Sequence, residues 1–466
     1  MALFREYDIR GIVGQELTED MAELIGRAYA TVATKQGAKT VSLGRDGRVS
    51  SPVLRDRLAK GMTAGGLNVI DIGPCPTPVL YFSLFHLPVD GGVMITGSHN
   101  AGEYNGFKLC VGKEALHGEE IQHLRKVVEG GRFSSGSGTV TERPILPDYL
   151  GYLKTAFAGV KADRLHVVID CGNGAASLVA KQALEQLGCR VTALYNELDG
   201  RFPNHHPDPT VTDNLHDLIA AVKTSGAHVG IGYDGDADRI GAVDERGDIL
   251  WGDRLMVLYA RDILAAKPGA TILSEVKASQ TLYDDIPRHG GRAIMWKTGH
   301  SLIKAKMKEE RAVLAGEMSG HMFFADRYFG YDDAVYASCR LIEILAKRNQ
   351  PLSSLVADLP KTHVTPEIRV DSPDQVKFEL VKRVQKRLLA YAKAGRTPGP
   401  EGLAIRDVVT IDGIRVIFDD GWGLIRASNT QPALVLRFEA STDRRLNEIR
   451  RLIESELDRA TRELAS

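Results

Sequence analysis

Residues 227–239, "AHVGIGYDGDADR", form a short apolar run that ends directly in a loop with three aspartates. A short run of small and β-branched residues, bounded by glycine, predicts a buried strand. The same transition from strand to polar loop occurs at "GGVMITGSHN" (91–100) and at "RAVLAGEMSGH" (311–321). Three copies of one transition indicate a structural unit that repeats along the chain.

A strand–helix–strand pattern precedes each of these loops. Such units favour parallel pairing of the two strands with a right-handed crossover. We therefore predict three similar mixed α/β domains whose loops lie at the carboxyl ends of their strands, where open α/β sheets bind ligands. The units begin at "TVSLGRDGR" (40–48), "LHVVIDCGNG" (165–174) and "ATILSEVKAS" (270–279), with expected helices over 51–65 and 176–188 and second strands at 68–73, 189–195 and 292–296.

The pattern changes from about residue 362. A long helix is expected over 374–393, and Asp412-Gly413 and "DDG" (419–421) predict tight turns between strands. These signals favour a smaller antiparallel α+β domain closed by a terminal helix. With a linker at "SSGSG" (134–138), the expected domains are 1–144, 145–247, 248–361 and 362–466.

Composition excludes several classes of protein. The 466 residues carry 59 basic and 60 acidic side chains, whereas binding to nucleic acid or an anionic membrane normally needs a basic excess. Neither a signal peptide nor an apolar run of about eighteen residues is evident. The five cysteines are scattered and form no CxxC, which favours a reducing, cytoplasmic compartment over a disulfide framework.

The loop "DGDADR" places Asp234, Asp236 and Asp238 on alternate residues after a buried strand. Carboxylate oxygens in a tight, glycine-containing turn suit a hard divalent cation such as Mg2+. A calcium loop of the EF-hand type would need glycine at its sixth position, where this chain has Arg239. An acidic surface loop is the remaining alternative, although such a loop rarely follows an apolar strand.

Ser98 has three possible roles: nucleophile, helix N-cap or ordinary loop residue. No G-x-S-x-G elbow surrounds it, so esterase chemistry has little support. His99 and Lys108 can donate to a phosphate, and the nearby glycines let backbone approach a ligand closely.

Two further loops carry candidate ligand-binding groups. In "GEMSGH" (316–321), Glu317 and Ser319 suit a vicinal diol of a sugar, but the stretch is equally compatible with an exposed strand end. "RASNTQP" (426–432) combines a guanidinium, two hydroxyls and an amide on one short turn. Such a set of donors favours a phosphate over an ordinary polar turn.

Taken together, these four loops resemble those of the α-D-phosphohexomutase superfamily, and within it the bacterial phosphomannomutase/phosphoglucomutase branch. The resemblance runs from "FREYDIRG" (4–11) to "RASNTQPALVLRFEA" (426–440). It implies four domains around a central cleft, three of them with one topology. Ala101 departs from the family, which commonly has proline there, so we expect a loop with a less restricted backbone.

The resemblance also assigns roles to the loops. Ser98 matches the phosphorylated serine, which together with Asp234, Asp236 and Asp238 holds Mg2+. Arg10, His99, Lys108 and Arg239 match groups beside the reacting phosphoryl group, with Lys108 a candidate for proton transfer or phosphate polarisation. Matches to substrate-binding positions are Tyr7, Lys277, His300, Glu317, Ser319 and His321, and to the phosphate clamp Arg426, Ser428, Asn429 and Thr430.

By this resemblance the protein interconverts hexose 1-phosphates and hexose 6-phosphates of mannose or glucose. Phospho-Ser98 and a hexose 1,6-bisphosphate, which also acts as activator, are the expected intermediates. A phosphoglucosamine mutase is one alternative, although that branch typically has "GEQSGH" where this chain has Met318. A non-catalytic sugar-phosphate sensor and a metal-dependent phosphatase are the others. We expect small-molecule sugar phosphates as partners, no nucleic acid or membrane, and a monomer or homodimer.

Overall fold

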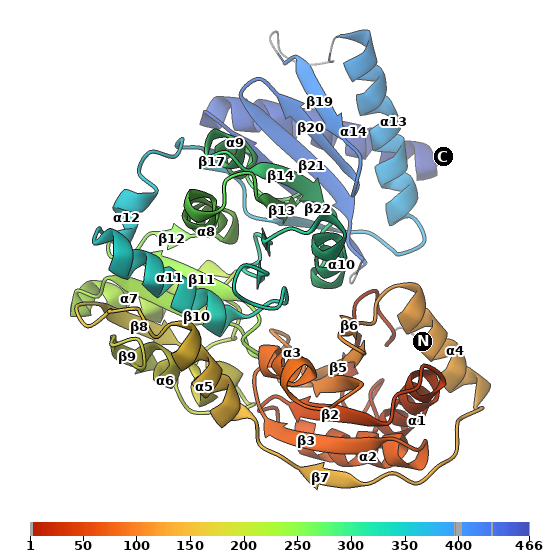
Figure 1. Ribbon diagram of the computed structural model, residues 1–466. Helices are drawn as coiled ribbons and strands as arrows, with labels where there is room; N and C mark the ends of the chain where they lie inside the picture. The colour runs from red at the N-terminus through yellow and green to blue at the C-terminus, as the bar shows by residue number, and fades with distance from the viewer. Residues whose placement is uncertain (1–2, 396, 398–402, 430–431, 466) are drawn as a thin grey trace.

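The chain folds into four successive domains, each built on its own β-sheet (Figure 1). The computed structural model describes residues 3–395, 397, 403–429 and 432–465. In Figure 1 the chain runs from the red and orange first domain, through the yellow-green second and the green and cyan third, to the blue fourth. None of the described helices is long and apolar enough to cross a membrane.

The first three sheets mix parallel and antiparallel strands. The first has the order β1-β5-β4-β2-β3-β7 with β6 beside β5: β1 (Ile9–Ile12), β2 (Thr40–Arg45), β3 (Asn68–Pro74), β4 (Gly91–Ile95), β5 (Tyr104–Val111), β6 (Glu114–Ala115) and β7 (Val140–Glu142). The second has the order β12-β11-β10-β8-β9: β8 (His166–Asp170), β9 (Arg190–Leu194), β10 (Val229–Tyr233), β11 (Ile240–Asp244) and β12 (Ile249–Leu250). The third has the order β14-β13-β15-β16: β13 (Thr271–Glu275), β14 (Arg292–Trp296), β15 (Leu314–Gly316) and β16 (Met322–Phe324).

A four-strand unit is common to these sheets. Its first strand pairs in parallel with the second and the third, and the third pairs antiparallel with the fourth. The third strand is β4, β10 or β15, and each of the three loops singled out in the sequence connects it to the fourth. The predicted repeat of mixed α/β domains is therefore confirmed, and each copy supplies one loop.

Helices flank these sheets. They are α1 (Glu19–Lys35), α2 (Ser51–Ala64), α3 (Thr77–His86), α4 (Glu119–Gly130), α5 (Leu146–Ala156), α6 (Ala180–Glu185), α7 (His216–Ser225), α8 (Gly252–Ala266), α9 (Gln280–Arg288), α10 (His300–Glu310), α11 (Ala334–Arg348) and α12 (Leu352–Leu355). The prediction of one helix over 176–188 is wrong. A 3-10 turn at Ala175–Leu178 precedes the short α6, and Val179 between them has a non-helical φ of −142°. Ala175 N donates instead to Gly235 O in the aspartate loop (2.9 Å).

The glycine-rich stretch at 134–138 does connect the first two domains, but it is held along the first. Gly136 N donates to Ala64 O (3.0 Å) and Gly138 N to Thr63 O (3.0 Å) at the end of α2. The chain then forms β7, which pairs in parallel with β3. An added Cβ at Gly138 would lie 1.9 Å from Leu67 O, so only glycine allows this close approach.

The fourth domain is an antiparallel sheet with two helices, as predicted. Its order is β17-β22-β21-β20-β19 with β18 beside β22: β17 (His363–Val364), β18 (Ile368–Asp371), β19 (Ile405–Val409), β20 (Ile414–Phe418), β21 (Gly421–Ala427) and β22 (Ala433–Ala440). Helices α13 (Lys377–Ala394) and α14 (Asp443–Ala465) pack on the sheet, and their apolar side chains share its core. The two predicted turns join β19 to β20 and β20 to β21, and Gly413 in the first has a φ of +75°.

The third and fourth domains share a buried contact. Val276, Trp422 and Leu424 form a small apolar cluster between them. Beside it, the fully buried guanidinium of Arg415 lies 3.8 Å from the Trp422 ring centroid. Arg415 Nη1 donates to the main-chain oxygens of Val276 and Ala278 (both 2.7 Å). These contacts fix the turn that follows β13 against the fourth sheet.

The close packing of α1 on α2 generates a stability prediction. An added Cβ at Gly61 would lie 2.1 Å from Glu23 O on α1, so Gly61→Ala forces the helices apart. We expect a loss of about 1–3 kcal/mol in the free energy of unfolding of the first domain, measured by urea titration. Gly151 on α5 has no atom within 4 Å of its Cβ position, so Gly151→Ala should stabilise by about 0.5–1 kcal/mol. Equal effects of the two substitutions would contradict this packing.

Candidate active site

Ser98 lies in the loop after β4, and its side chain faces the second domain. It is 2% exposed and has a left-handed φ of +49°, which is unusual for a residue other than glycine. Its Oγ donates to Asp234 Oδ2 (3.1 Å) and lies 3.1 Å from His99 Nδ1. A buried hydroxyl between a carboxylate and an imidazole excludes the reading of Ser98 as an ordinary exposed loop residue.

The three aspartates after β10 are completely buried. One carboxylate oxygen from each of Asp234, Asp236 and Asp238 lies within 4.8 Å of the others. Asp236 Oδ1 and Asp238 Oδ1 have no hydrogen-bond partner among the described residues. Burial, and then the neighbouring Asp238 and Asp236, raise the pKa of Asp234 well above its usual value. Carboxylate oxygens without a hydrogen-bond partner, in a place with excess negative charge, fit the ligands of a hard divalent cation.

Lys108 on β5 is buried against the same aspartates. Its Nζ donates to Asp236 Oδ2 (2.9 Å) and also to Asp238 Oδ2. Burial opposes the charged ammonium, but Asp236 and Asp238 together raise the pKa of Lys108 above its usual value. The sequence-based expectation had Lys108 facing a phosphate. In the structure its Nζ donates to two carboxylates, and its part in proton transfer or phosphate polarisation stays a prediction.

Two threonines that sequence reasoning missed complete the surroundings of Asp236. Thr77 Oγ1 donates to Asp236 Oδ2 (2.6 Å), and Thr77 N, at the start of α3, donates to Asp236 O (2.9 Å). Thr96 Oγ1 donates to Asp236 Oδ2 (3.2 Å) and accepts from Ser98 N (2.8 Å). The first domain thus holds the aspartate loop of the second through side chains and backbone.

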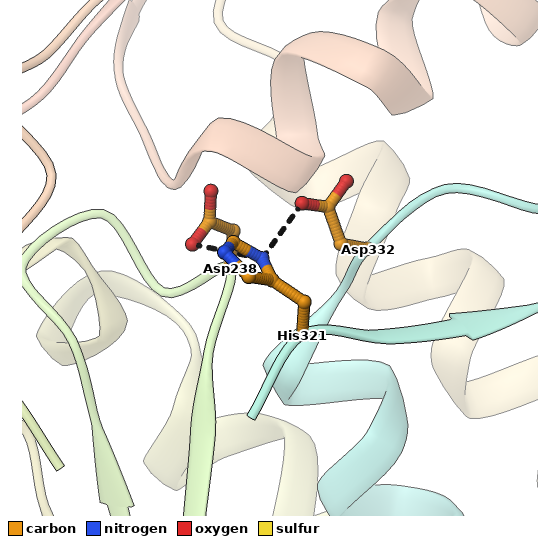
Figure 2. A group of neighbouring side chains, drawn as sticks. All are labelled: Asp238, His321 and Asp332. Carbon is orange, nitrogen blue, oxygen red and sulfur yellow. Dashed lines mark ion pairs between the residues drawn. The ribbon is translucent and has the colours of Figure 1, made fainter. Parts of the chain in front are cut away.

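His321 joins the aspartate loop to the third domain. Figure 2 shows its ring between the carboxylates of Asp238 and Asp332, with Nδ1 2.9 Å from Asp332 Oδ2 and 3.5 Å from Asp238 Oδ1. On the other side of the ring, Arg239 Nε donates to His321 Nε2 (2.9 Å). Asp238, His321 and Asp332 form a second group with the spacing of metal ligands, but Lys304 already pairs with Asp332 (3.1 Å).

The loop at 316–321, which is predicted to contact the sugar and is called the sugar loop, is held by buried carboxylates. Glu317, which is 3% exposed, accepts from Gly299 N through Oε1 (2.7 Å). Glu275, at the end of β13, accepts from Met318 N (3.2 Å) and from Thr298 Oγ1 (2.6 Å). Sequence reasoning missed Glu275, although a carboxylate at a strand's carboxyl end was an available signal. Ser319 is half-buried next to Glu317, and their contacts to sugar hydroxyls stay predictions.

Tyr7 connects three domains. Its hydroxyl donates to Thr298 O in the third domain (2.9 Å) and accepts from Asn429 Nδ2 in the fourth (2.8 Å). The ring also packs edge-on against His300, with centroids 5.8 Å apart. Gly299, with φ +133°, allows this contact because an added Cβ would lie 2.4 Å from Tyr7 Cζ.

The turn predicted to bind phosphate lies at the end of β21. Arg426 is 5% exposed, and its Nε donates to Asp412 Oδ2 (2.9 Å) on the preceding hairpin. Ser428 is also buried, and Asn429 reaches Tyr7 as described above. Thr430 lies outside the described residues.

The two remaining predicted cations are both paired. Lys277 is buried and its Nζ donates to Glu367 Oε2 in the fourth domain (3.0 Å). Lys277, with burial opposing, lowers the pKa of Glu367 to about 2. Arg10 on β1 donates from Nη1 to Asn100 Oδ1 in the serine loop (2.6 Å) and pairs with Asp8. Its Nε is buried without a hydrogen-bond partner among the described residues.

A metal-binding experiment distinguishes the two groups of acidic ligands. Asp234→Asn removes a charged ligand from the aspartate loop alone. We expect Mn2+ affinity, followed by electron paramagnetic resonance, to fall by more than the roughly 10–100-fold typical of an outer-shell change. Asp332→Asn, a member of the other group, should leave the affinity largely intact. The reverse result would place the ion at Asp238, His321 and Asp332.

Models of the phosphoglucomutase/phosphomannomutase family match the chain in four consecutive parts. The alpha/beta/alpha domains I, II and III match residues 1–134, 147–247 and 251–363, and the C-terminal domain matches residues 367–455. The order of the matches follows the four sheets.

Relatives and solved structures agree over almost the whole chain. A phosphomannomutase/phosphoglucomutase of Pseudomonas putida is 47% identical over 464 residues, 99% of this chain and 97% of that protein. A phosphoglucomutase of Neisseria gonorrhoeae is 45% identical over 460 residues, 97% of each. The crystal structure of a phosphoglucomutase/phosphomannomutase family protein from Burkholderia thailandensis has a TM-score of 0.90 at 40% identity and covers 99% of this chain and 98% of that one. This chain belongs to the phosphoglucomutase/phosphomannomutase family.

Proposed function

We propose that the protein is a phosphohexomutase that interconverts the 1-phosphates and 6-phosphates of mannose, glucose or both. The observation that carries the proposal is the contact between Ser98 Oγ and Asp234 Oδ2 (3.1 Å), which places a buried serine hydroxyl on the three-aspartate group. Relatives at 45–47% identity are named for mannose and glucose phosphates. A phosphoglucosamine mutase is therefore not favoured, in keeping with Met318 in the sugar loop.

The reaction cycle begins with Ser98 phosphorylated. Its phosphoryl group passes to the free hydroxyl of a hexose 1-phosphate, which forms the 1,6-bisphosphate and regenerates the Ser98 hydroxyl. The bisphosphate turns over in the site, and its other phosphoryl group returns to Ser98, which releases hexose 6-phosphate. A trace of hexose 1,6-bisphosphate supplies the first phosphoryl group to the unmodified protein.

The aspartate loop would hold the ion that this chemistry uses. Asp234, Asp236 and Asp238, with an oxygen of phospho-Ser98, are the proposed Mg2+ ligands. Bound Mg2+ supplies charge neutralisation, on which phosphoryl transfer depends more than on covalent help from the protein. The two unpaired oxygens described above fit this role.

The remaining side chains divide between the reacting group and the sugar. Near the phosphoryl group we assign donors or proton carriers to Arg10, His99, Lys108 and Arg239. A histidine and two polar groups face the sugar hydroxyls, namely Glu317, Ser319 and His321. The phosphate that is not transferred meets the turn at the end of β21 and the groups opposite it, namely Tyr7, Lys277, His300, Arg426, Ser428, Asn429 and Thr430.

Phosphorylation at Ser98 is the direct test. We expect the wild-type protein, after incubation with glucose 1,6-bisphosphate, to gain the mass of one phosphoryl group on the peptide containing Ser98. Coupled assays on mannose, glucose and glucosamine 1-phosphates should show turnover on at least one of the first two. Ser98→Ala should lose nearly all turnover, by roughly 10⁴-fold or more, yet still bind substrate. Inactivity of the wild type on all three sugars would refute the proposal, and turnover without a phosphorylated intermediate would favour a phosphatase.

Glu367 generates a second prediction about this site. Its carboxylate neutralises Lys277, so an incoming phosphate must displace it before Lys277 can bind. Because a hydrogen bond to a charged group contributes about 1.5–3 kcal/mol, Glu367→Gln should lower KM for the sugar 1-phosphate by roughly tenfold. Glu379→Gln removes a carboxylate from an exposed pair on α13 and serves as the matched control with unchanged KM. An unchanged or higher KM in Glu367→Gln would contradict the competition.

A further inference from the structure

Arg48 lies directly beneath the serine loop, and its side chain has no exposed surface. We propose that Arg48 is a positioning residue that fixes the backbone of the loop at 97–104 and thereby aims the Ser98 hydroxyl at the aspartate group. The inference rests on the proposed function, because it assigns Arg48 to the step in which Ser98 gives and takes a phosphoryl group.

The guanidinium of Arg48 is almost entirely committed to the loop. Nη2 donates to Ser98 O (2.8 Å) and to Asn100 O (2.5 Å). Nη1 donates to Ala101 O (2.6 Å) and to Tyr104 O (2.9 Å). Four main-chain oxygens within seven residues therefore converge on one planar fork. Lysine could not replace this arrangement, since its three donors leave a single nitrogen.

Asp46 extends the same unit to the start of the loop. Arg48 Nε donates to Asp46 Oδ2 (3.1 Å), which also accepts from Gly97 N (3.1 Å). Asp46 Oδ1 accepts from Arg48 N (3.0 Å) and Ser51 Oγ (2.6 Å), which ties the pair to the first turn of α2. Because Asp46 neutralises the guanidinium, Arg48 acts through the backbone and is no free cation for a phosphate.

The conformation of Ser98 explains why such a support is needed. A left-handed backbone at a residue other than glycine costs roughly 1–3 kcal/mol and persists only where its surroundings enforce it. Ser98 has φ +49°, and Arg48 binds its carbonyl oxygen directly. Gly97 leaves room for the guanidinium, since an added Cβ would lie 2.5 Å from both Nε and Cζ of Arg48.

The second domain closes this unit from the other side. The Phe202 ring lies over the guanidinium, with Arg48 Cζ 5.1 Å from its centroid. Backbone at Gly200 approaches so closely that an added Cβ would lie 2.3 Å from Arg48 Cα. Hydrogen bonds shielded from water are stronger, so this cover rigidifies the loop. Ala101 lacks the fixed φ of a proline, but its carbonyl oxygen is one of the four acceptors of Arg48, and this bond holds the backbone there.

The experiment compares two buried arginines. Arg48→Lys keeps the charge but loses the fork, and we expect kcat to fall by roughly 100-fold with KM changed by less than about threefold. Arg340 on α11 is 1% exposed and bonds Asp326 in the third domain, so Arg340→Lys is the matched control with unchanged kcat. Gly97→Ala displaces the guanidinium but keeps the arginine, and it should reproduce the loss of kcat. If Arg48→Lys does not fold, this variant tests the positioning role of Arg48.

Hydrogen exchange gives a readout that does not depend on activity. In Arg48→Lys, or in Gly97→Ala, amides of the peptide 97–104 should exchange at least tenfold faster than in the wild type, while peptides of the fourth domain stay unchanged. Unchanged loop exchange, or an unchanged kcat in a folded variant, would overturn the positioning role. A wild-type protein without mutase activity would instead refute the proposed function, and the exchange data would still decide whether Arg48 holds the loop.

Discussion

The constraint on which the structure depends is the burial of three carboxylates at one place. Asp234, Asp236 and Asp238 have no exposed surface, and an unpaired buried charge costs several kcal/mol even after relaxation. Lys108 supplies one cation at Asp236 and Asp238, and Arg239 lies 3.9 Å from Asp234 Oδ2. Burial and the two neighbouring carboxylates raise the pKa of Asp234 above its usual value. A site in this state is electrostatically prepared for a divalent cation before one arrives.

Burial at this place requires the domains to meet there. The aspartate loop belongs to the second domain, but Lys108 and Thr77 come from the first and His321 from the third. Repetition of one α/β unit makes this possible, because each copy sends its loop from the same strand position. The repeated topology is thus a way to bring chemically different loops to one point, and the candidate catalytic groups are distributed over domains for the same reason.

Local sequence patterns predicted the fold and the loops, but they did not predict the contacts between domains. The strand before Asp234, the turn at Gly413 and the antiparallel fourth sheet follow from periodicity and turn residues, which act over a few positions. The pairing of Lys108 with Asp236 spans 128 residues, and no local signal carries it. Arg48 was visible at a strand's carboxyl end, but its acceptors are main-chain oxygens, which have no sequence signature. The helix predicted over 176–188 is interrupted at Val179, whose φ is −142°, and the turn before it is held by a bond from Ala175 N to Gly235 O in the aspartate loop, 60 residues away in sequence.

Buried cations near the fourth domain are paired in the same way as the buried carboxylates of the aspartate loop. Arg426 and Lys277 are buried cations, and each holds a carboxylate of the fourth domain, Asp412 or Glu367. Asp412 Oδ2 also accepts from Thr298 N of the third domain (3.1 Å), so both carboxylates link the two domains. A phosphate carries up to about −2 and can replace a carboxylate at such a cation. Lys277 lies in the third domain and Glu367 in the fourth, so a phosphate that replaces Glu367 at Lys277 removes a link between them. We therefore expect phosphate binding to weaken the contact between the third and fourth domains.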